Sequence, residues 1–243
     1  MCKLGALGGA DASAQSLAEG STAVLTKACR RLLLKKPTTV TAATKNQNGE
    51  AAKDGGAVDF VRLGPLDEAN SIRWAIDGLA FLSLNAEVKE AIVQDELLVA
   101  AIFKVAEMGL LDAAFPLASL LANLTNSFEE KEISPEMLEL AKYAKQHVPQ
   151  KHELDAPNVV AARRQLLLDL GLPSCLYNLT MNFCHLYHEL QDSFEFTAVI
   201  SVILGVYLAA AECVEKRGLL VSAGAGKALL NLALETNTED GKL

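Results

Sequence analysis

Apolar positions recur every three to four residues along most of the chain, which is the spacing of an amphipathic helix. The pattern predicts a first helix over residues 18–34, and from Leu66 onward nearly every segment has the same period. Helix-breaking residues interrupt it at Asn85, Gly109, Asn126, Pro135, Pro149, Pro157, Gly171, Gly218 and Gly224. We therefore expect an all-α fold of short helices.

Residues 35–65 lack this pattern. Their sequence is polar and rich in small residues, with almost no large apolar side chain before Phe60. Such a segment cannot bury enough apolar surface to offset the entropy lost on ordering. We predict a flexible polar loop over 35–65 that follows an N-terminal helical segment, 1–34.

A weak internal repeat relates two later stretches. Gly78–Ile92 aligns with Leu120–Ser134 at a shift of 42 positions. After a slip of two residues, Glu96–Phe103 aligns with Glu136–Tyr143. A period near 40 residues with two or three helices per unit is typical of armadillo and HEAT proteins. The sequence thus predicts an armadillo/HEAT-like α-solenoid, and an irregular helical bundle is the alternative. The identical pairs are Leu79/Leu121, Ala80/Ala122, Leu82/Leu124, Glu87/Glu129, Lys89/Lys131 and Glu90/Glu132.

The repeat register also suggests a binding surface. Stacked units curve into a superhelix whose concave side is lined by the third helix of each unit and suits an extended peptide. In this register the candidate partner-binding residues on third helices are Phe103, Lys104, Lys142, Tyr143 and Gln146. The alternative for each is an exposed residue without a partner. Trp74, the single tryptophan, has helical spacing with Ile72 and Leu79 and is expected in the core.

Composition narrows the possible partners and the compartment. The net charge is -8 without a basic block, which argues against nucleic-acid binding. The uncharged run Phe196–Ala211 is shorter than the roughly 20 residues that span a bilayer, so we expect a fully buried helix there and no membrane association. Five cysteines in no regular framework, and no signal peptide at the start, indicate a cytoplasmic protein with reduced thiols.

Two histidine clusters are candidate metal sites. Cys184 and His188 are four residues apart and share a helical face, with His185 three before His188, but a closed zinc site needs four ligands. His147 and His152 lie on either side of Pro149, where a helix ends. We favour core packing for the first cluster and a solvated helix exit for the second, so we expect no metal, no cofactor and no enzyme. A zinc enzyme built on the first cluster is the alternative.

Four segments resemble one known family. They are Cys2–Leu33, Ile72–Glu96 (IRWAIDGLAFLSLNAEVKEAIVQDE), Leu120–Asp155 and Glu215–Glu235 (EKRGLLVSAGAGKALLNLALE). Together they cover well over half of the chain and are similar, in the same order, to the UCS-domain myosin chaperones. The resemblance implies armadillo-like repeats over 66–155, at the end of the family's central region, and the start of the UCS region over 156–243.

The same resemblance implies a function. Family members fold and assemble the myosin motor domain and work with Hsp90, which they grip through a tetratricopeptide region. This chain shows no such region and stops where the family continues through further repeats, so its Hsp90 docking and its myosin groove are expected to be incomplete. Residues 36–59 look like a loop insertion, and Cys184–Cys213 departs from the family pattern. The alternative function is a general armadillo adaptor that binds peptides without chaperone activity.

Overall fold

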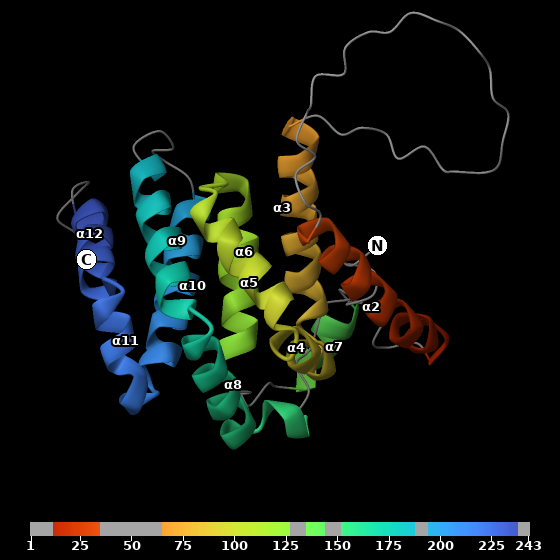
Figure 1. Ribbon diagram of the computed structural model, residues 1–243. Helices are drawn as coiled ribbons and strands as arrows, with labels where there is room; N and C mark the ends of the chain where they lie inside the picture. The colour runs from red at the N-terminus through yellow and green to blue at the C-terminus, as the bar shows by residue number, and fades with distance from the viewer. Residues whose placement is uncertain (1–11, 35–64, 127–134, 144–151, 188–193, 238–243) are drawn as a thin grey trace, which may run out of the picture.

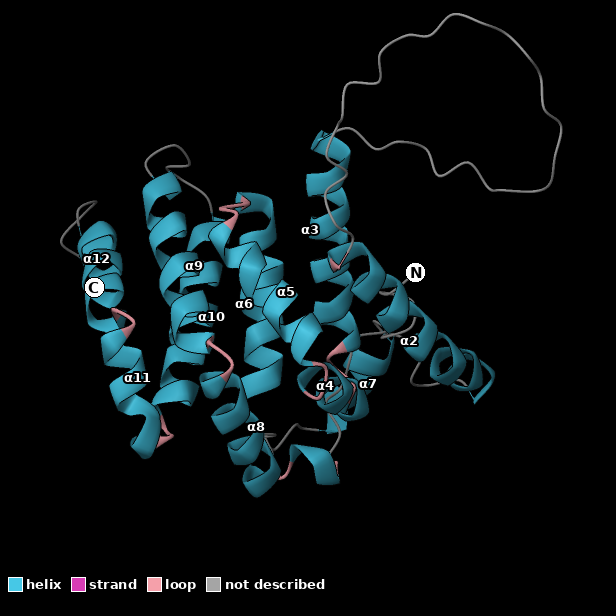
Figure 2. Ribbon diagram, in the orientation of Figure 1, coloured by secondary structure: helices cyan, strands magenta, loops and turns pink. Residues whose placement is uncertain are grey.

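The described part of the chain is built from helices. The computed structural model describes residues 12–34, 65–126, 135–143, 152–187 and 194–237. Within these ranges there are α-helices and short 3-10 helices but no strand (Figure 2), which confirms the all-α prediction. In chain order the helices are α2 (Ala12–Leu33), α3 (Pro65–Leu82), α4 (Ala86–Val93), α5 (Glu96–Glu107), α6 (Leu111–Thr125), α7 (Pro135–Tyr143), η1 (Glu153–Asp155), α8 (Pro157–Asp169), α9 (Leu172–Tyr187), α10 (Phe194–Ala211), η2 (Val214–Lys216), α11 (Arg217–Ser222) and α12 (Ala225–Asn237).

The helices stack in two rows. Helix α6 packs between α3 and α10, and we call these three helices the α6 row. Helix α9 packs between α5 and α12, and we call these three the α5 row; α2 packs mainly against α3, with a smaller contact to α5. The shorter helices α4, α8 and α11 each precede a helix of the α5 row. Figure 1 shows the helices side by side, from α2 at one end to α11 and α12 at the other. Repeated three-helix units confirm the solenoid prediction.

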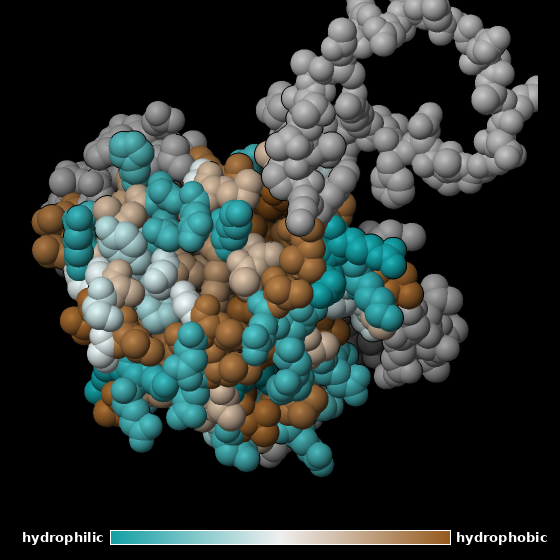
Figure 3. All heavy atoms as spheres, viewed as in Figure 1, coloured by the Kyte–Doolittle hydropathy of each residue, from teal (hydrophilic) through white to brown (hydrophobic). Residues whose placement is uncertain are grey.

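The two rows share one continuous core. Each helix contributes a stripe of aliphatic side chains, and Ile76, Leu79, Ile102, Leu121 and Leu176 are at most 1% exposed. One helix cannot cover its own apolar stripe, so each unit depends on its neighbours for burial. Among the described residues no further helix covers the α11–α12 edge, and Figure 3 shows apolar groups along it. The exposed large residues there are Leu219, Val221, Leu230 and Leu234.

Three glycines end helices as the sequence predicts. Gly109, Gly171 and Gly224 follow α5, α8 and α11 with φ of 62°, 111° and 92°. Residues other than glycine rarely adopt these positive φ angles. A residue with such a backbone angle ends the helix and turns the chain back. The predicted break at Gly218 is wrong, because this residue lies in the first turn of α11. The first turn tolerates glycine since its amides have no partner within the helix in any case.

The structure confirms the 42-residue repeat where it relates the end of α3 to the end of α6, and contradicts its continuation into the following helices. Asn123, near the end of α6, donates to the carbonyl oxygen of Ala80 and to Ser83 Oγ, both at 3.0 Å, so the ends of α3 and α6 lie together as the alignment requires. The continued alignment places α5 on α7, and this is wrong. Helix α5 packs against α9 within the stack. Helix α7 has no equivalent place there and is an additional helix before the next unit, which begins at α8.

Buried charges join α4, η1 and α8. Asp155 accepts from Lys89 Nζ at 2.7 Å and lies 3.4 Å from Arg163 Nη1. Arg163, with a side chain that is 1% exposed, also donates to the carbonyl oxygen of Leu154 at 2.7 Å and lies 3.4 Å from Glu90. Its guanidinium is therefore fully surrounded by acceptors. Removing such a partner strands the remaining buried charges, which costs much more than losing a surface ion pair.

The neighbouring residue Arg164 serves the α6 row. Its Nε donates to the carbonyl oxygen of Thr125, the last residue of α6, and its Nη1 pairs with Glu212, just after α10. The Arg164 side chain is 8% exposed. One guanidinium thus holds the C-terminal ends of α6 and α10 at the same level.

A further ion pair attaches α2 to the start of α5. Arg30 Nη2 lies 3.3 Å from Asp95 Oδ1, and Asp95 is also the N-cap of α5, accepting from the amide of Leu98 at 3.1 Å. The hydrogen bond from Arg30 lowers the pKa of the Asp95 carboxyl below its ordinary value. The ionised carboxylate is the form that both contacts require.

Replacing Arg163 with methionine tests the buried junction. The change leaves Asp155 and Glu90 without their guanidinium partner, so we expect a loss of about 3 kcal/mol in the free energy of unfolding, measured by urea titration. Arg73→Met is the matched control, because Arg73 forms an exposed pair with Asp112 and its loss is worth at most about 1 kcal/mol. Equal losses for the two variants would contradict the assigned role of Arg163.

Gly224→Ala tests the turn between α11 and α12. The residue has a positive φ, and an added Cβ would lie 3.0 Å from Tyr177 Cε2. We expect a destabilisation of about 1–3 kcal/mol. Gly226→Ala is the control, since a Cβ there meets nothing within 4 Å and alanine favours the helix by up to about 1 kcal/mol. A neutral Gly224→Ala variant would show that the turn is not constrained in this way.

Candidate binding surface

The α6 row presents large apolar side chains to solvent. Trp74 on α3 is 64% exposed, Phe115 on α6 is 49% exposed, and Leu204 and Leu208 on α10 are 38% and 71% exposed. We call these four residues the row face. Each lies opposite the buried stripe of its own helix, so packing within the fold does not account for its apolar character.

Hydrogen bonds and an ion pair fix the relative height of the three helices. Arg73 Nη1 lies 3.4 Å from Asp112 Oδ2, which brings the exposed sides of α3 and α6 together. Trp74, Phe115 and Leu204 each precede the last residue of their helix by seven to ten positions. An α-helix rises about 1.5 Å per residue, so the three residues lie within about 5 Å of one level. They form a line across the row, with Leu208 one turn further along α10.

Little free charge accompanies this line. Arg73 and Asp112, which flank Trp74 and Phe115, neutralise each other. Asp77, one turn after Trp74 on α3, adds a half-buried carboxylate, whereas half-buried Ser119 on α6 and Gly205 on α10 are small and uncharged. Exposed apolar side chains grouped in this way mark an interaction site.

The residues selected from the sequence do not form this surface. Phe103 is 8% exposed and lies in the core, with its ring 3.9 Å from a Cβ placed at Gly171, so its prediction as a surface residue is wrong. Lys104 is exposed on α5, in the α5 row, and Tyr143 is 90% exposed on α7. The side chain of Lys142 and all of Gln146 lie outside the described residues. The cause is the register error that treated α5 and α7 as third helices.

Sequence reasoning also missed the row face itself. Trp74 was expected in the core because it has helical spacing with Leu79, but Ala75 and Ile76, the next two residues, take the buried positions. The available signal was the pair of polar residues Asn70 and Asp77, four positions before Trp74 and three after it, because residues at these spacings share a helical face. Phe115 carried a similar signal, three residues after Asp112.

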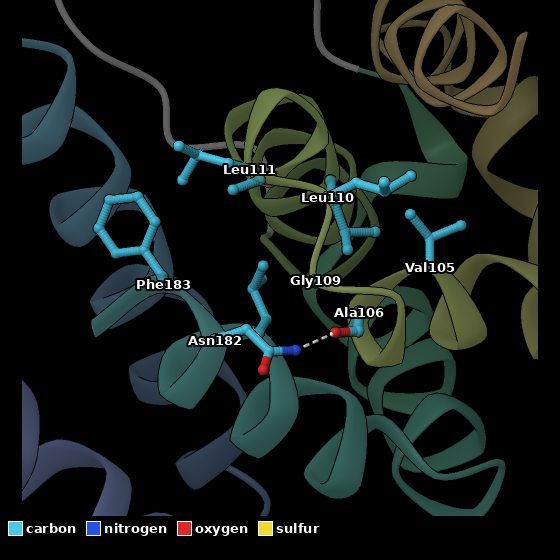
Figure 4. Close-up of a pocket in the computed structure, with 10 residues that line it drawn as sticks. Val105, Ala106, Gly109, Leu110, Leu111, Asn182 and Phe183 are labelled. Atoms are coloured by element: carbon cyan, nitrogen blue, oxygen red, sulfur yellow. Dashed lines mark hydrogen bonds between the residues drawn. The ribbon is translucent and has the colours of Figure 1, made fainter. Parts of the chain in front are cut away.

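The small pocket in Figure 4 lies where α9 crosses the turn between α5 and α6. Asn182 donates to the carbonyl oxygen of Ala106 at 2.8 Å, and Leu110, Leu111 and Phe183 line the apolar remainder. Its volume of about 10 Å³ holds roughly one water molecule. The pocket is a gap between packed helices and is too small for a substrate.

The thiol and the imidazoles of the alternative zinc site lie in different environments, as the favoured interpretation of core packing expects. On α9, Cys184 is buried while His185 is exposed, and His188 lies outside the described residues. No group of three or more potential metal ligands occurs in the described ranges. On the same helix, burial raises the pKa of the Cys175 thiol well above its ordinary value, which disfavours a reactive thiolate.

The second histidine cluster has one described member. His152 is exposed, and its Nδ1 accepts from the amide of Leu154 at 3.1 Å, which caps η1. His147 lies outside the described residues. A capping role on the solvent side agrees with the interpretation of this histidine as part of a helix exit.

The apolar segment near residue 200 forms most of α10. The expectation that this segment is fully buried is wrong, because Leu208 and Ser201 face solvent. In the described ranges no single helix is long and apolar enough to cross a membrane. The pair Thr197–Ala211 and Val214–Ser222 meets the length and composition criteria only jointly, with a bend of 102° between its members.

Known proteins resemble the chain in both sequence and structure. It is 34% identical to Protein unc-45 homolog B of Danio rerio over 243 residues and 35% identical to that of Homo sapiens over 246 residues, in both cases across 100% of this chain. The solved structure of UNC-45 from Drosophila melanogaster matches 99% of the chain with a TM-score of 0.60 and 33% identity. The chain belongs to the UNC-45 family.

The match to UNC-45 proteins is partial in one direction. The chain spans 22% of the length of the two unc-45 homolog B proteins and 25% of the Drosophila UNC-45 chain. No protein-family profile matches it. The described helices and the row face therefore correspond to one segment of an UNC-45 protein.

The exposure of Trp74 can be measured directly, because it is the only tryptophan. We expect red-shifted emission from the folded chain and strong quenching by acrylamide, with little further red shift when the chain unfolds in urea. Free tryptophan amide under the same conditions supplies the reference for full exposure. Blue-shifted emission with weak quenching would instead place Trp74 in the core.

Proposed function

We propose that the chain acts as a client-binding segment of a myosin-directed co-chaperone, which binds the myosin motor domain and helps it fold and assemble together with Hsp90. The observation that carries the proposal is the similarity to UNC-45 proteins, at 33–35% identity, across essentially the whole chain. The resemblance to the UCS-domain myosin chaperones supplies the client and the cytoplasmic setting. This role requires neither catalysis nor a cofactor.

The row face supports a role in client binding. An incompletely folded motor domain exposes apolar segments that are buried in its native state, and such segments aggregate unless they are covered. Trp74, Phe115, Leu204 and Leu208 offer an apolar surface on a rigid stack of helices. Aromatic side chains contribute most to such contacts because they bury a large area with little loss of rotamer entropy.

The Hsp90 part of the proposal has a different basis. In the family that the chain resembles, Hsp90 is held by a tetratricopeptide region, and the armadillo-like units engage myosin. The described units α4–α6 and α8–α10 are of the second kind. We therefore assign the client, and not Hsp90, to the row face.

A general peptide adaptor is less well supported. Armadillo-type adaptors can hold a peptide backbone through side-chain amides, but Asn123 already donates to the Ala80 carbonyl and to Ser83 within the fold. Its amide hydrogens are thus committed to the contact between α3 and α6. Capture of one defined peptide without any effect on the aggregation of a client would favour the adaptor.

Light scattering of a warmed myosin motor fragment tests the proposed function. We expect the chain in molar excess to suppress the rise in scattering, and Trp74→Glu/Phe115→Glu to lose most of that effect because two charges would enter the apolar line. Leu97→Glu is the matched control, since Leu97 is 66% exposed but lies on α5. A wild-type chain that is folded by circular dichroism yet leaves scattering unchanged would overturn the proposal.

A further inference from the structure

Helix α7 lies on a segment that leaves the stack at the end of α6 and rejoins it at η1. Consecutive residues of α8 hold the two ends of this segment. Arg164 Nε donates to the carbonyl oxygen of Thr125 at the first end, and Arg163 Nη2 donates to the carbonyl oxygen of Leu154, at 2.7 Å, at the second. Two neighbouring side chains therefore close the base of residues 127–151, which we call the α7 arm.

Direct contacts between helices join the stack on either side of the arm. Helix α6, which precedes the arm, packs against both α8 and α10, and α5 packs against α9. Buried Asp155 accepts from Lys89 Nζ of α4 at 2.7 Å, which adds a polar contact across the same boundary. None of these contacts uses a residue of the arm. The two parts of the stack are thus held together without it.

Helix α7 itself adds little to the core. It packs extensively against no other described helix. Met137, Leu140 and Tyr143 are 59%, 60% and 90% exposed, so these large side chains contribute little of the free energy of burial. A helix of 9 residues is also too short to be stable by itself in water. The stability of α7 should therefore be low and separate from that of the stack.

We propose that the α7 arm is a separable unit, which can open or be removed while the stack keeps its structure. Arg163 and Arg164 form its boundary, because each bonds to the stack beside one end of the arm. The length of the arm adds little to the cost of closing its base, since that cost grows only with the logarithm of the length. The inference concerns the fold and does not depend on client binding.

Native-state hydrogen exchange tests whether α7 opens by itself. A part of a protein that opens locally exchanges its amides at a lower free energy than parts that require global unfolding. After correction for intrinsic rates, we expect the amides of residues 139–143 to exchange at least about a hundredfold faster than those in the middle of α6 and α8. Equal protection of the three helices would overturn the inference.

Replacing the arm with a flexible linker tests whether the stack needs it. A linker of about 12 glycine and serine residues spans up to about 40 Å, which suffices for two ends held by adjacent residues of α8. We expect the equilibrium constant of unfolding, measured by urea titration, to stay within about tenfold of the wild-type value. A larger increase, or a chain that fails to fold, would overturn the inference.

Arg163→Met supplies the comparison for that measurement. It removes the partner of buried Asp155 and should raise the same equilibrium constant at least about a hundredfold. The factor should be equal with and without the arm, because changes to separate parts of a fold are additive. A factor that collapses when the arm is absent would show that arm and junction form one unit, which contradicts the inference. No client is present in either measurement, so failure here is distinguishable from failure of the proposed function.

Discussion

The stack depends on side chains that hydrogen-bond to the carbonyl groups at the C-terminal ends of helices. The last carbonyls of a helix have no partner within it, and an unsatisfied buried carbonyl is costly. Here neighbouring helices supply the donors: Asn123 to Ala80, Asn182 to Ala106 and Arg164 to Thr125. Apolar faces made of leucine and alanine can slide past one another, whereas these bonds exist in only one register. They thereby determine which residues meet across the row face.

Two consecutive arginines on helix α8 make contacts that join several neighbouring elements. Arg163 serves α4 and η1, and Arg164 serves the ends of α6 and α10. Successive positions on a helix point about 100° apart, so adjacent arginines reach different neighbours. Each guanidinium is nearly buried yet supplied with acceptors, which is the condition under which a buried charge is tolerated. The unit α8–α10 is consequently held to its predecessor by polar contacts as well as by leucine packing.

The fold class could be predicted from the sequence because individual residues mark both the helical period and the length of the repeat. Leu79 and Leu121 occupy matching places at the ends of α3 and α6, and the glycines at 109, 171 and 224 end helices as expected. The register beyond Asn126 could not be predicted, because α5 and α7 are both leucine- and alanine-containing helices that begin with glutamate or proline–glutamate. Only tertiary packing distinguishes a helix of the α5 row from the additional helix.

The binding surface was harder to predict for a related reason. Helical spacing shows that Trp74 and Leu79 share part of a face, but a face is wide enough to be buried on one side and open on the other. Phe103 and Lys104 illustrate the same limit, since adjacent positions on α5 lie in the core and in solvent. Which side is covered depends on the neighbouring helix, and that helix is distant in the sequence: Asp112 on α6, which contacts Arg73, is 39 positions away.

The position of Arg164 has a consequence for how such a surface can change. It touches none of the four residues of the row face, yet it holds together the ends of two helices that carry three of them. Substitution of this single side chain would alter the splay of α6 and α10, and with it the interval between their contact points. The relative placement of the surface residues thus depends on a side chain that is not itself part of the surface.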